Sequence, residues 1–566
     1  MIIKKLIPVC LAIIMILSIV ACATDSTPAG GGGTTGSIGT TGGTFGRYEE
    51  PVTVTIGRTA NLGMDWPDGD SWEDNFCTQW LLDNMNINVE FAYLVDNSDE
   101  RLTLAIVAGE IPDIVVFQQR NTLRQLIEND LIADLTDVFE QYACPVTTLM
   151  VNKSEGVFHQ IGGHDGRLYA LAMDDSGGLY PDMMFIRDDW LEITGLSAPT
   201  TLDELIHVAS TFVEQDLAGG GQTIGIAVNN WIIPGGGSYN QVASISPIFA
   251  MFGSKPEAWL PNAAGEYVYS SVQPETKAAL TLLADMYQMG IIDREFATMD
   301  FVAAIAAGRP GIVMGPNWMP MWPLNDTMNN FDDAIWNAYP VPMDANGRYF
   351  AVIQSEGGSY SATRKDFAHP EILVKLFSIS TQLRDMVEGV VPDWDMLNPD
   401  LIPMANYRRD NNLGWGTFPL NSWTNDNMDA IIGGRIYEDL IDQVARGVDI
   451  DFGPLAPSIV SNMEDYIAFR EGDRAASVRR GFGEARGRAT LSISYPFFNV
   501  TTALIPFPTD TLNERGADLY DLEQRTFLQI IMGEQPVDHF DEFVRLWHEL
   551  GGATLTEEFN EQARAR

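Results

Sequence analysis

The sequence predicts an α/β fold built from more than one lobe. Strand-like and helix-like segments alternate from Val52 onward, a pattern typical of a sheet wrapped by helices. Hydrophobic residues make up 45% of the chain and aromatic residues 10%, which is enough for large packed cores. The chain has 566 residues, and single cores rarely grow beyond about 250–300 residues. We therefore expect two or more lobes, each with its own core.

The first residues are typical of an exported protein. Two lysines precede an uncharged, mostly aliphatic stretch at 6–20, which ends in small residues and Cys22. This stretch is short for a transmembrane helix, which needs about 20 apolar residues, and polar residues follow at once. The pattern resembles the lipobox of bacterial lipoproteins, whose new N-terminal cysteine carries lipid. We expect a signal peptide at 1–21 and lipidation of Cys22.

The segment 22–50 is predicted to be a tether. Residues 29–46 are almost entirely glycine, threonine and serine, so they cannot bury apolar surface. A flexible coil of this length spans roughly 30 Å. The folded part of the chain is thus expected to stand clear of the membrane.

A first set of elements predicts a parallel sheet. Strict alternation at 52–56 predicts a half-buried strand, and 87–95 predicts a second one. Amphipathic stretches at 72–85 and 98–108 predict helices, and the apolar run 114–117 predicts a third strand. Strands separated by helices in this way are expected to run parallel.

A second set of elements begins near Met183. The sequence Thr-Leu-Asp-Glu at 201–204 is a capping box for the next helix, and 224–228 predicts a strand. Residues 274–290 predict the clearest helix of the chain, because apolar residues recur at helical spacing until a final glycine. The segment 540–550 carries aromatic residues on one helical face. No long sequence period recurs, so a repeat architecture is not expected.

Charge and motifs exclude several functions. The net charge is −43, so nucleic acid and anionic membrane surfaces are poor partners. The six histidines form no metal-ligand spacing, a Gly-x-Ser-x-Gly motif is absent, and the glycine clusters do not match phosphate loops. The acidic stretch 421–429 lacks the pattern of a calcium loop. We expect no enzyme activity, no cofactor and no metal site, while a bound structural calcium stays open.

Two cysteines remain once the signal peptide is removed, Cys77 and Cys144. No CxxC spacing occurs, so a zinc site has no support. A disulfide between the two and a pair of buried free thiols both stay open.

Several stretches together resemble the extracellular solute-binding proteins of family 1, lipoproteins that feed sugars to bacterial ABC importers. They are 105–114 (AIVAGEIPDI), 166–171 (GRLYAL), 303–318 and 369–371 (HPE). The segment 530–560 resembles the large-lipoprotein subgroup of Gram-positive bacteria. Two positions depart from the family pattern, with Ala172 where proline is usual and Gly311-Ile312 in place of Ala-Met.

The resemblance implies a two-lobed periplasmic-binding-protein-like fold of type II, with parallel-rich sheets and a hinged cleft. It places the first part of the N-lobe at 51–173, the first part of the C-lobe at 174–355, and the remaining segments of both lobes with C-terminal helices at 356–566. It also implies a monomer that binds a carbohydrate, closes over it and delivers it to ABC permease subunits. The expected location is the extracellular face of the cell membrane, through the lipid anchor only.

Trp318 is the leading candidate for ligand contact. The apolar run 312–314 breaks at Gly315-Pro316, and the carboxyl ends of strands in α/β sheets face the ligand cleft. In the maltodextrin-type relatives the matching tryptophan stacks on a sugar ring. A flat aromatic ring that buries a pyranose face contributes on the order of 1 to 2 kcal/mol. Trp322 follows four residues later and either shares this face or packs internally.

Further candidates lie in predicted loops and could bind sugar faces or hydroxyls. They are Trp66, Trp231, Trp415, Asp65, Asn230, Asn317, Asp174 and Glu356. For each of them a packing or solvated role stays open. Trp190, Trp259 and Trp547 are predicted to be packing residues instead.

Two other functions stay open at this point. A surface-anchored carbohydrate-active enzyme would share the acidity and the exposed aromatic residues. A binding protein for a peptide or another non-sugar solute would also fit an acidic surface.

Overall fold

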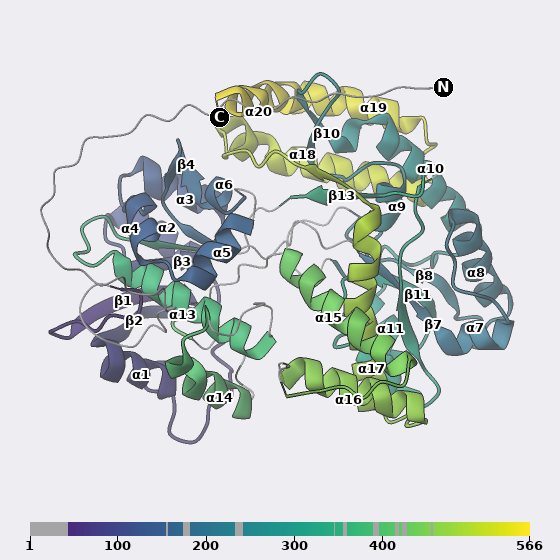
Figure 1. The fold of residues 1–566 in the computed structure, drawn as a ribbon. Helices are drawn as coiled ribbons and strands as arrows, with labels where there is room; N and C mark the ends of the chain where they lie inside the picture. The colour runs from purple at the N-terminus through teal and green to yellow at the C-terminus, as the bar shows by residue number, and fades with distance from the viewer. Residues whose placement is uncertain are drawn as a thin grey trace, which may run out of the picture. The chain divides into compact units, whose positions relative to one another are not determined.

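Two mixed β-sheets organise the chain (Figure 1). The computed structural model describes residues 43–565, except 154–156, 174–181, 233–240, 345, 355–358, 389–395, 412, 414–417, 421–426, 454 and 456. The predicted signal peptide, Cys22 and most of the tether lie outside the described residues. The predicted ligand residues Asp174, Glu356 and Trp415 also lie outside them.

The first sheet has five strands in the order β2-β1-β3-β14-β6. They are β1 (Val52–Thr59), β2 (Ile87–Val95), β3 (Ile114–Phe117), β6 (Leu171–Met173) and β14 (Ser359–Thr363). Strand β1 runs parallel to β2 and β3, as the alternation of strands and helices predicted. Strand β14 runs antiparallel to β3 and β6, so the sheet is mixed.

The second sheet has four strands in the order β12-β7-β11-β8. They are β7 (Met183–Arg187), β8 (Ile224–Ala227), β11 (Pro310–Gly315) and β12 (Trp336–Tyr339). Strand β11 is parallel to β8, whereas β7 is antiparallel to β11 and to β12. A separate parallel pair joins β13 (Tyr349–Ile353) to β15 (Phe498–Thr502).

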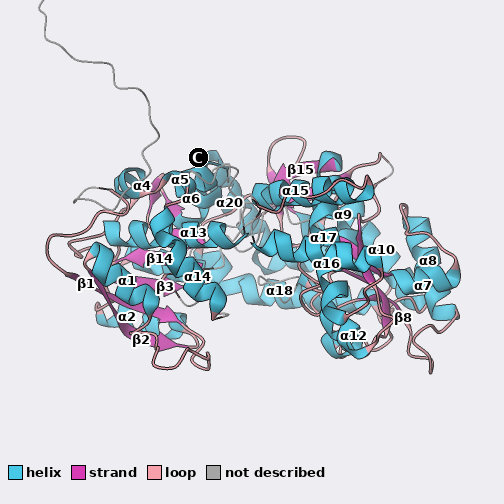
Figure 2. Cartoon of the chain, turned by 60° about the horizontal axis from the view of Figure 1, so that its bottom comes forward, coloured by secondary structure: helices cyan, strands magenta, loops and turns pink. Residues whose placement is uncertain are grey.

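Helices surround the strands (Figure 2). Those nearest the first sheet in sequence are α1 (Phe76–Met85), α2 (Ser98–Ala108), α3 (Arg120–Glu128), α4 (Thr136–Tyr142), α5 (Pro145–Lys153), α6 (Val157–Gly162), α13 (Glu371–Glu388) and α14 (Ile402–Asp410). Those that follow β7 are α7 (Asp188–Thr194), α8 (Leu202–Glu214), α9 (Ser246–Met251), α10 (Pro274–Gln288), α11 (Phe301–Ala306) and α12 (Leu324–Asn330). The C-terminal helices are α15 (Asn427–Ala445), α16 (Pro457–Glu471), α17 (Ala476–Ser494), α18 (Asp510–Ile531), α19 (His539–Trp547) and α20 (Ala553–Ala565).

Two short strand pairs lie outside these sheets. They are β4 (Gly163–His164) with β5 (Arg167–Leu168), and β9 (Trp259–Pro261) with β10 (Tyr267–Tyr269). Among the described residues, no helix combines the length and the hydropathy that a membrane span requires.

Strand β3 shows how the first sheet buries both faces. Ile114 and Val116 belong to one hydrophobic cluster, which includes α1 and α13, while Val115 and Phe117 belong to another. All four side chains are buried, as expected of a strand covered by helices on both sides. The short apolar run at 114–117 is therefore a central strand.

Local signals explain where the helices begin. The predicted helix at 72–85 begins only at Phe76, because the Asn75 side chain accepts hydrogen bonds from the backbone N–H groups of Cys77 and Thr78. The predicted capping box at the start of α8 is present, with the hydroxyl of Thr201 accepting from the N–H of Glu204 at 3.3 Å. The cap, rather than the amphipathic pattern, fixes the first turn.

Three tryptophans and both mature cysteines are buried. Trp190, Trp259 and Trp547 are 3%, 7% and 2% exposed, which confirms their predicted packing role. Cys77 and Cys144 are free thiols in the core beneath the first sheet, so no disulfide joins them. Burial raises the pKa of the Cys77 thiol to about 12, which makes it unreactive.

The strand register brings loop positions together at one edge of each sheet. In the second sheet Val313 of β11 lies opposite Ala227 of β8, so these two parallel strands end side by side. In the first sheet β1 ends beside β2, with Thr59 opposite Val95. We call this the carboxyl edge of each sheet, because the parallel strands end there.

Candidate functional site

The carboxyl edge of the second sheet carries four of the predicted site residues. Asn230 and Trp231 follow β8, and Asn317 and Trp318 follow β11. Because β8 and β11 are parallel neighbours, the register places both pairs at the same edge. The sequence could propose each pair separately, but only the register shows that they share an edge.

Residues 316–323, which we call the Trp318 loop, are held against α17 by glycines. A Cβ atom at Gly487 would lie 2.6 Å from the Asn317 carbonyl oxygen, and one at Gly483 would lie 3.1 Å from Pro320. A Cβ at Gly315 would lie 2.3 Å from the Met319 sulfur. At Gly487 the helix and loop backbones meet, and only glycine permits so close an approach. These glycines therefore fix the position from which Trp318 projects.

Trp318 and Trp322 are both half-buried and pack against the core of the second sheet. Each ring thus has a supported part and an accessible part, so the packing and ligand roles left open for them are compatible. The neighbouring Asn317 side chain is 5% exposed. No hydrogen bond to its amide group is found within the described part of the chain, so this buried amide has capacity to bind a further group.

Residues 229–232, which we call the β8 loop, present an exposed indole. Trp231 is 43% exposed, and its backbone N–H donates to the Asn229 side chain at 3.0 Å. Asn229 in turn donates to the Val242 carbonyl at 2.6 Å. The carbonyl of Asn230 accepts from the Gln524 side chain of α18 at 3.0 Å. The buried carboxamide that shapes this loop is therefore Asn229, which sequence reasoning missed, beside the predicted Asn230.

At the carboxyl edge of the first sheet, Arg58 at the end of β1 is 4% exposed and was not predicted. Its guanidinium donates to the carbonyls of Phe418 at 2.7 Å, Pro419 at 3.0 Å and Thr59 at 3.0 Å. It also lies 5.5 Å from the Trp72 ring. Burial lowers the pKa of Arg58 to about 10, so it stays charged at neutral pH. An arginine inside an alternating strand was the only signal available in the sequence.

Residues 60–75, which we call the β1 loop, contain two more predicted residues. Trp66 is half-buried and makes an edge-to-face contact with Trp72, with ring centroids 5.3 Å apart. Asp65 is exposed. The aromatic pair is supported by Phe91 of β2, 6.2 Å from Trp72. Trp66 therefore has a packing contact in addition to an accessible part.

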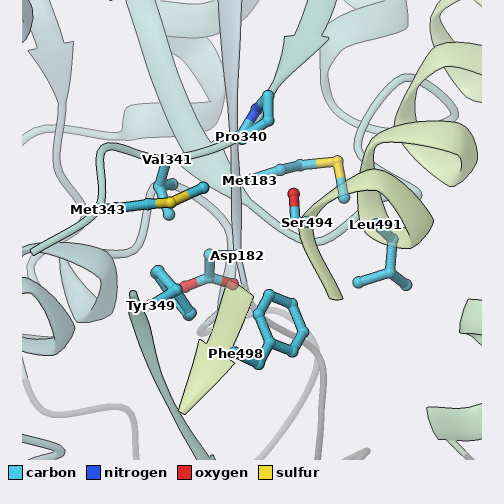
Figure 3. A pocket seen from close by; sticks show the side chains of 9 residues that line it. All are labelled: Asp182, Met183, Pro340, Val341, Met343, Tyr349, Leu491, Ser494 and Phe498. Carbon is cyan, nitrogen blue, oxygen red and sulfur yellow. The ribbon is translucent and has the colours of Figure 1, made fainter. Parts of the chain in front are cut away.

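A small pocket lies near the start of β7, where Asp182 meets Tyr349 and Phe498 from the β13–β15 pair (Figure 3). It has room for the centre of about one water molecule, 10 Å³, so it does not accommodate a sugar ring. Burial raises the pKa of Asp182 to about 6, while Lys255 and the Ser244 hydroxyl oppose the shift. Burial and the Asp182 charge also raise the pKa of the Tyr349 hydroxyl.

The structure also bears on metal chemistry. Among the described residues, no three histidine, cysteine, aspartate or glutamate side chains lie close enough to hold a metal ion. Most of the acidic stretch 421–429 lies outside the described residues. The arrangement at the carboxyl edges consists of indoles, carboxamides and carboxylates, which suits binding of a polar solute with apolar faces.

Comparisons with known proteins agree with this fold. A family model described as bacterial extracellular solute-binding protein matches residues 82–363. Lipoprotein LipO of Bacillus subtilis is 20% identical over 479 residues, covering 83% of this chain and 85% of LipO. The polygalacturonan/rhamnogalacturonan-binding protein YtcQ of the same organism is 24% identical over 238 residues, covering 41% of this chain and 44% of YtcQ. The Streptococcus pneumoniae ABC-transporter substrate-binding protein FusA, solved with kestose, matches with a TM-score of 0.55 at 15% identity, covering 90% of this chain and 98% of FusA.

Proposed function

The chain belongs to the bacterial extracellular solute-binding proteins, and on that premise we propose that it captures an oligosaccharide for an ABC importer. Members of this family bind solutes for transport and perform no chemical step. The narrower proposal concerns the solute. The solute is a carbohydrate, which binds between the carboxyl edges of the two sheets and passes from there to the membrane permease.

One observation carries the proposal, the pair of accessible indoles at one edge. Trp231 is 43% exposed, and Trp318 is half-buried and follows the end of the neighbouring parallel strand. An accessible indole at a sheet edge offers a ligand a flat apolar face. A pyranose has an apolar face of C–H groups that matches an indole plane, and each such stack contributes on the order of 1 to 2 kcal/mol.

Carboxamides supply the polar half of the binding. Asn317 is 5% exposed, and its amide group has no hydrogen-bond partner among the residues that the structure describes. A sugar hydroxyl that loses its water needs such a donor or acceptor. Names of relatives support the same class, since YtcQ is named for galacturonan polymers and FusA was solved with kestose.

The proposed mechanism is closure of two lobes around the solute. Ligand contacts at both carboxyl edges favour the closed state by their differential affinity for it, and the permease recognises that state. We expect the protein to act as a monomer. The proposed lipid on Cys22 and the tether at 22–50 would keep it at the extracellular face of the membrane, and the name of the relative LipO supports such an anchor.

The function is tested by thermal shift against panels of oligosaccharides and peptides. A ligand at 100 times its dissociation constant should stabilise the protein by about 2.7 kcal/mol. An oligosaccharide that stabilises the wild type, but stabilises the Trp231→Ala variant less, supports the proposal. Stabilisation by peptides alone would replace it with the peptide-binding alternative. Release of reducing ends from a bound oligosaccharide would contradict a purely binding role.

The anchor is tested by substitution of Cys22. In a bacterial host, wild type should enter the detergent phase after extraction, whereas Cys22→Ser should stay in the aqueous phase or retain its signal peptide. Equal partition of both forms would remove the lipid anchor from the proposal.

A further inference from the structure

We infer that residues 505–508, which we call the arm, form a clasp between the two sheets. The arm fastens elements around the first sheet to elements around the second and keeps the carboxyl edges accessible to a solute. It has to release one of its two sides before the edges can close. This inference rests on the proposed closure mechanism and names the contacts that oppose closure.

Two consecutive residues at the start of the arm are buried in different cores. Leu504 is 5% exposed in the hydrophobic cluster of the second sheet, and its N–H donates to the Trp259 carbonyl at 2.8 Å. Ile505 is 2% exposed in the cluster of Val115 and Phe117, on one face of the first sheet. A rotation of one sheet relative to the other therefore changes backbone torsions at or beside this pair.

The arm itself is stiff, because its sequence is Ile-Pro-Phe-Pro. The proline rings fix φ at Pro506 and Pro508, and each proline also restricts the residue before it to extended conformations. All four residues of the arm are restricted in this way. We therefore expect the arm to move as one piece during closure.

The backbone of the arm is bound by helix α3, which packs in the same cluster as Ile505. The Pro506 carbonyl accepts a hydrogen bond from the Arg120 guanidinium. The Pro508 carbonyl accepts one from Arg124 at 3.4 Å. Both prolines thus present their carbonyls to the side of the first sheet.

The Phe507 ring makes a further contact on this side. It lies against the His164 ring of β4, with centroids 4.3 Å apart and planes inclined by 30°. The guanidinium carbon of Arg120 lies 5.7 Å from the Phe507 ring centroid. With the burial of Ile505, these contacts fix the arm to the elements around the first sheet.

Gln562 of α20 fastens the arm to the second sheet. Its side-chain oxygen accepts from the Phe507 N–H at 2.8 Å, and its amide nitrogen donates to the Phe507 carbonyl at 2.9 Å. Helix α20 belongs to the second core, where Leu555 and Phe559 are 2% and 1% exposed. The Gln562 side chain is half-buried, so water can replace its two hydrogen bonds more easily than it can enter the core around Ile505. Gln562 is therefore the contact that releases.

The fastened arrangement leaves the carboxyl edges open to solvent. Trp231 is 43% exposed, Met321 is 55% exposed, and Asp65 is exposed as well. A solute can thus reach these side chains while the arm is bound on both sides. Loss of two hydrogen bonds of ordinary net strength should shift the equilibrium toward the closed state about tenfold.

The test measures the distance between spin labels at the two edges by electron paramagnetic resonance, without solute. The labels are attached at Asp96→Cys and Met321→Cys, exposed positions that follow β2 and β11, in the mature chain carrying Cys22→Ser. Cys77 and Cys144 are buried and stay unlabelled. In Gln562→Ala the population at a shorter distance should rise about tenfold over wild type. An unchanged distance distribution would overturn the inference.

Asn560 of the same helix offers a matched control. Its side chain holds Tyr267 in the same way, accepting from the N–H and donating to the carbonyl at 2.8 Å each. Both partners belong to the side of the second sheet, so Asn560→Ala should lower the melting temperature without changing the label distance. An equal shift in both variants would show that loosening of α20, and not release of the arm, changes the distance.

His164→Ala tests the other end of the clasp. It removes the ring contact with Phe507 and should shift the distance in the same direction as Gln562→Ala. The double variant should shift it no further than the larger single effect, because a clasp that is open at one end no longer joins the two sides. Additive shifts would contradict the clasp. Because His164 is partly exposed, this variant keeps the test valid even if Gln562→Ala frays α20.

Binding separates this inference from the carbohydrate function. The oligosaccharide that most stabilises the wild type in the thermal-shift panel should bind Gln562→Ala severalfold more tightly, because the closed state is more populated. If no oligosaccharide binds but the label distance shifts, the carbohydrate function fails and the clasp stands. If an oligosaccharide binds and the distance does not shift, the clasp is wrong and the function stands.

Discussion

The β1 loop and the Trp318 loop both follow a buried strand, but the fold supports them differently. About half of the residues of the β1 loop are exposed. The loop is held at its two ends, by the hydrogen bonds of Arg58 to distant carbonyls and by the Asn75 side chain at the start of α1. The Trp318 loop is mostly buried and is held along its length by the glycine face of α17. The β1 loop is thus held by a few hydrogen bonds at its ends, whereas the Trp318 loop packs against helix α17.

From this difference we infer different tasks for the two carboxyl edges. A loop with close backbone contacts keeps an indole in one place, which suits a stacking platform. An exposed loop with carboxylates changes the charge and hydrogen bonding offered to the ligand without changing the fold. We therefore expect distinct effects from substitutions at four positions. They are Arg58, Glu523, Gly487 and Trp231.

Removal of the hydrogen bonds of Arg58 should have the largest effect on the free energy of unfolding. In Arg58→Met the buried carbonyls of Thr59, Phe418 and Pro419 lose their donor, and unmet buried carbonyls cost about 1–3 kcal/mol each. We expect the free energy of unfolding to fall by about 3–5 kcal/mol in urea denaturation. The exposed Arg525 offers a control, since Arg525→Met should change it by less than about 0.5 kcal/mol. Equal stability of the two variants would show that Arg58 does not pin the loop.

The stability of the protein should depend on pH through Glu523 of α18, the residue before Gln524, which bonds to the β8 loop. Glu523 is fully buried and accepts a hydrogen bond from the Tyr269 hydroxyl at 2.8 Å, and burial raises its pKa from 4.5 to about 7. The folded protein keeps this proton up to about pH 7, whereas the unfolded chain releases it near pH 4.5. The contribution is therefore fully present below pH 4.5 and is lost as pH rises to about 7, by up to about 3 kcal/mol.

The measurement compares unfolding free energies between pH 4.5 and 8. Glu523→Gln mimics the protonated acid, so the variant should lose this pH dependence and exceed wild type in stability at pH 8. Glu514→Gln changes an exposed acid of the same helix and should keep the wild-type profile. If the unfolding free energy of Glu523→Gln depends on pH as that of the wild type does, the Glu523 proton does not cause this pH dependence.

The glycine contact is tested by Gly487→Ala. The added Cβ would lie 2.6 Å from the Asn317 carbonyl, so the loop and α17 must separate, at a cost of about 1–3 kcal/mol. Ligand affinity measured by calorimetry should fall as well, because the Trp318 platform moves. A Cβ at Gly433 of α15 meets no atom within 4 Å, so Gly433→Ala should stabilise the protein by about 0.5–1 kcal/mol and leave affinity unchanged. If Gly487→Ala binds ligand with wild-type affinity, the close contact between α17 and the Trp318 loop does not position Trp318.

The smallest expected effect distinguishes Trp231, at the second sheet, from Trp66, at the first. Trp231→Ala should weaken oligosaccharide binding about tenfold, or about 1.4 kcal/mol, with little change in melting temperature, because the ring is 43% exposed. Trp66→Ala should lower the melting temperature, because it removes the contact with Trp72. If Trp231→Ala binds as wild type does, the β8 loop is not part of the platform.

Much of the fold could be predicted from local patterns. The alternation at 52–56 and the apolar runs at 114–117 and 312–314 are strands, and the helical spacing at 274–290 is α10. The capping box at Thr201 is formed as predicted. These signals hold because strand and helix periodicity, and the satisfaction of a helix's first N–H groups, depend on residues a few positions apart.

The site could be predicted only in part. The Gly315-Pro316 break correctly marked a strand end, and Trp231 is exposed as a loop tryptophan should be. The buried carboxamide Asn229 was missed beside Asn230, because adjacent residues of one type carry no sign of which one turns inward. The buried role of Arg58 was missed for a different reason, since its partners lie 360 and 361 residues away.

The sequence by itself determined the acidity of the chain and the position of many helices and strands, and it predicted an export signal. Tertiary structure alone decided that β14 returns antiparallel, that Gly487 touches Asn317, and that two strand ends bring Trp231 and Trp318 to one edge. The physical reason is range. Periodicity and capping are satisfied within a few residues, whereas register and close packing are satisfied only when segments hundreds of residues apart meet.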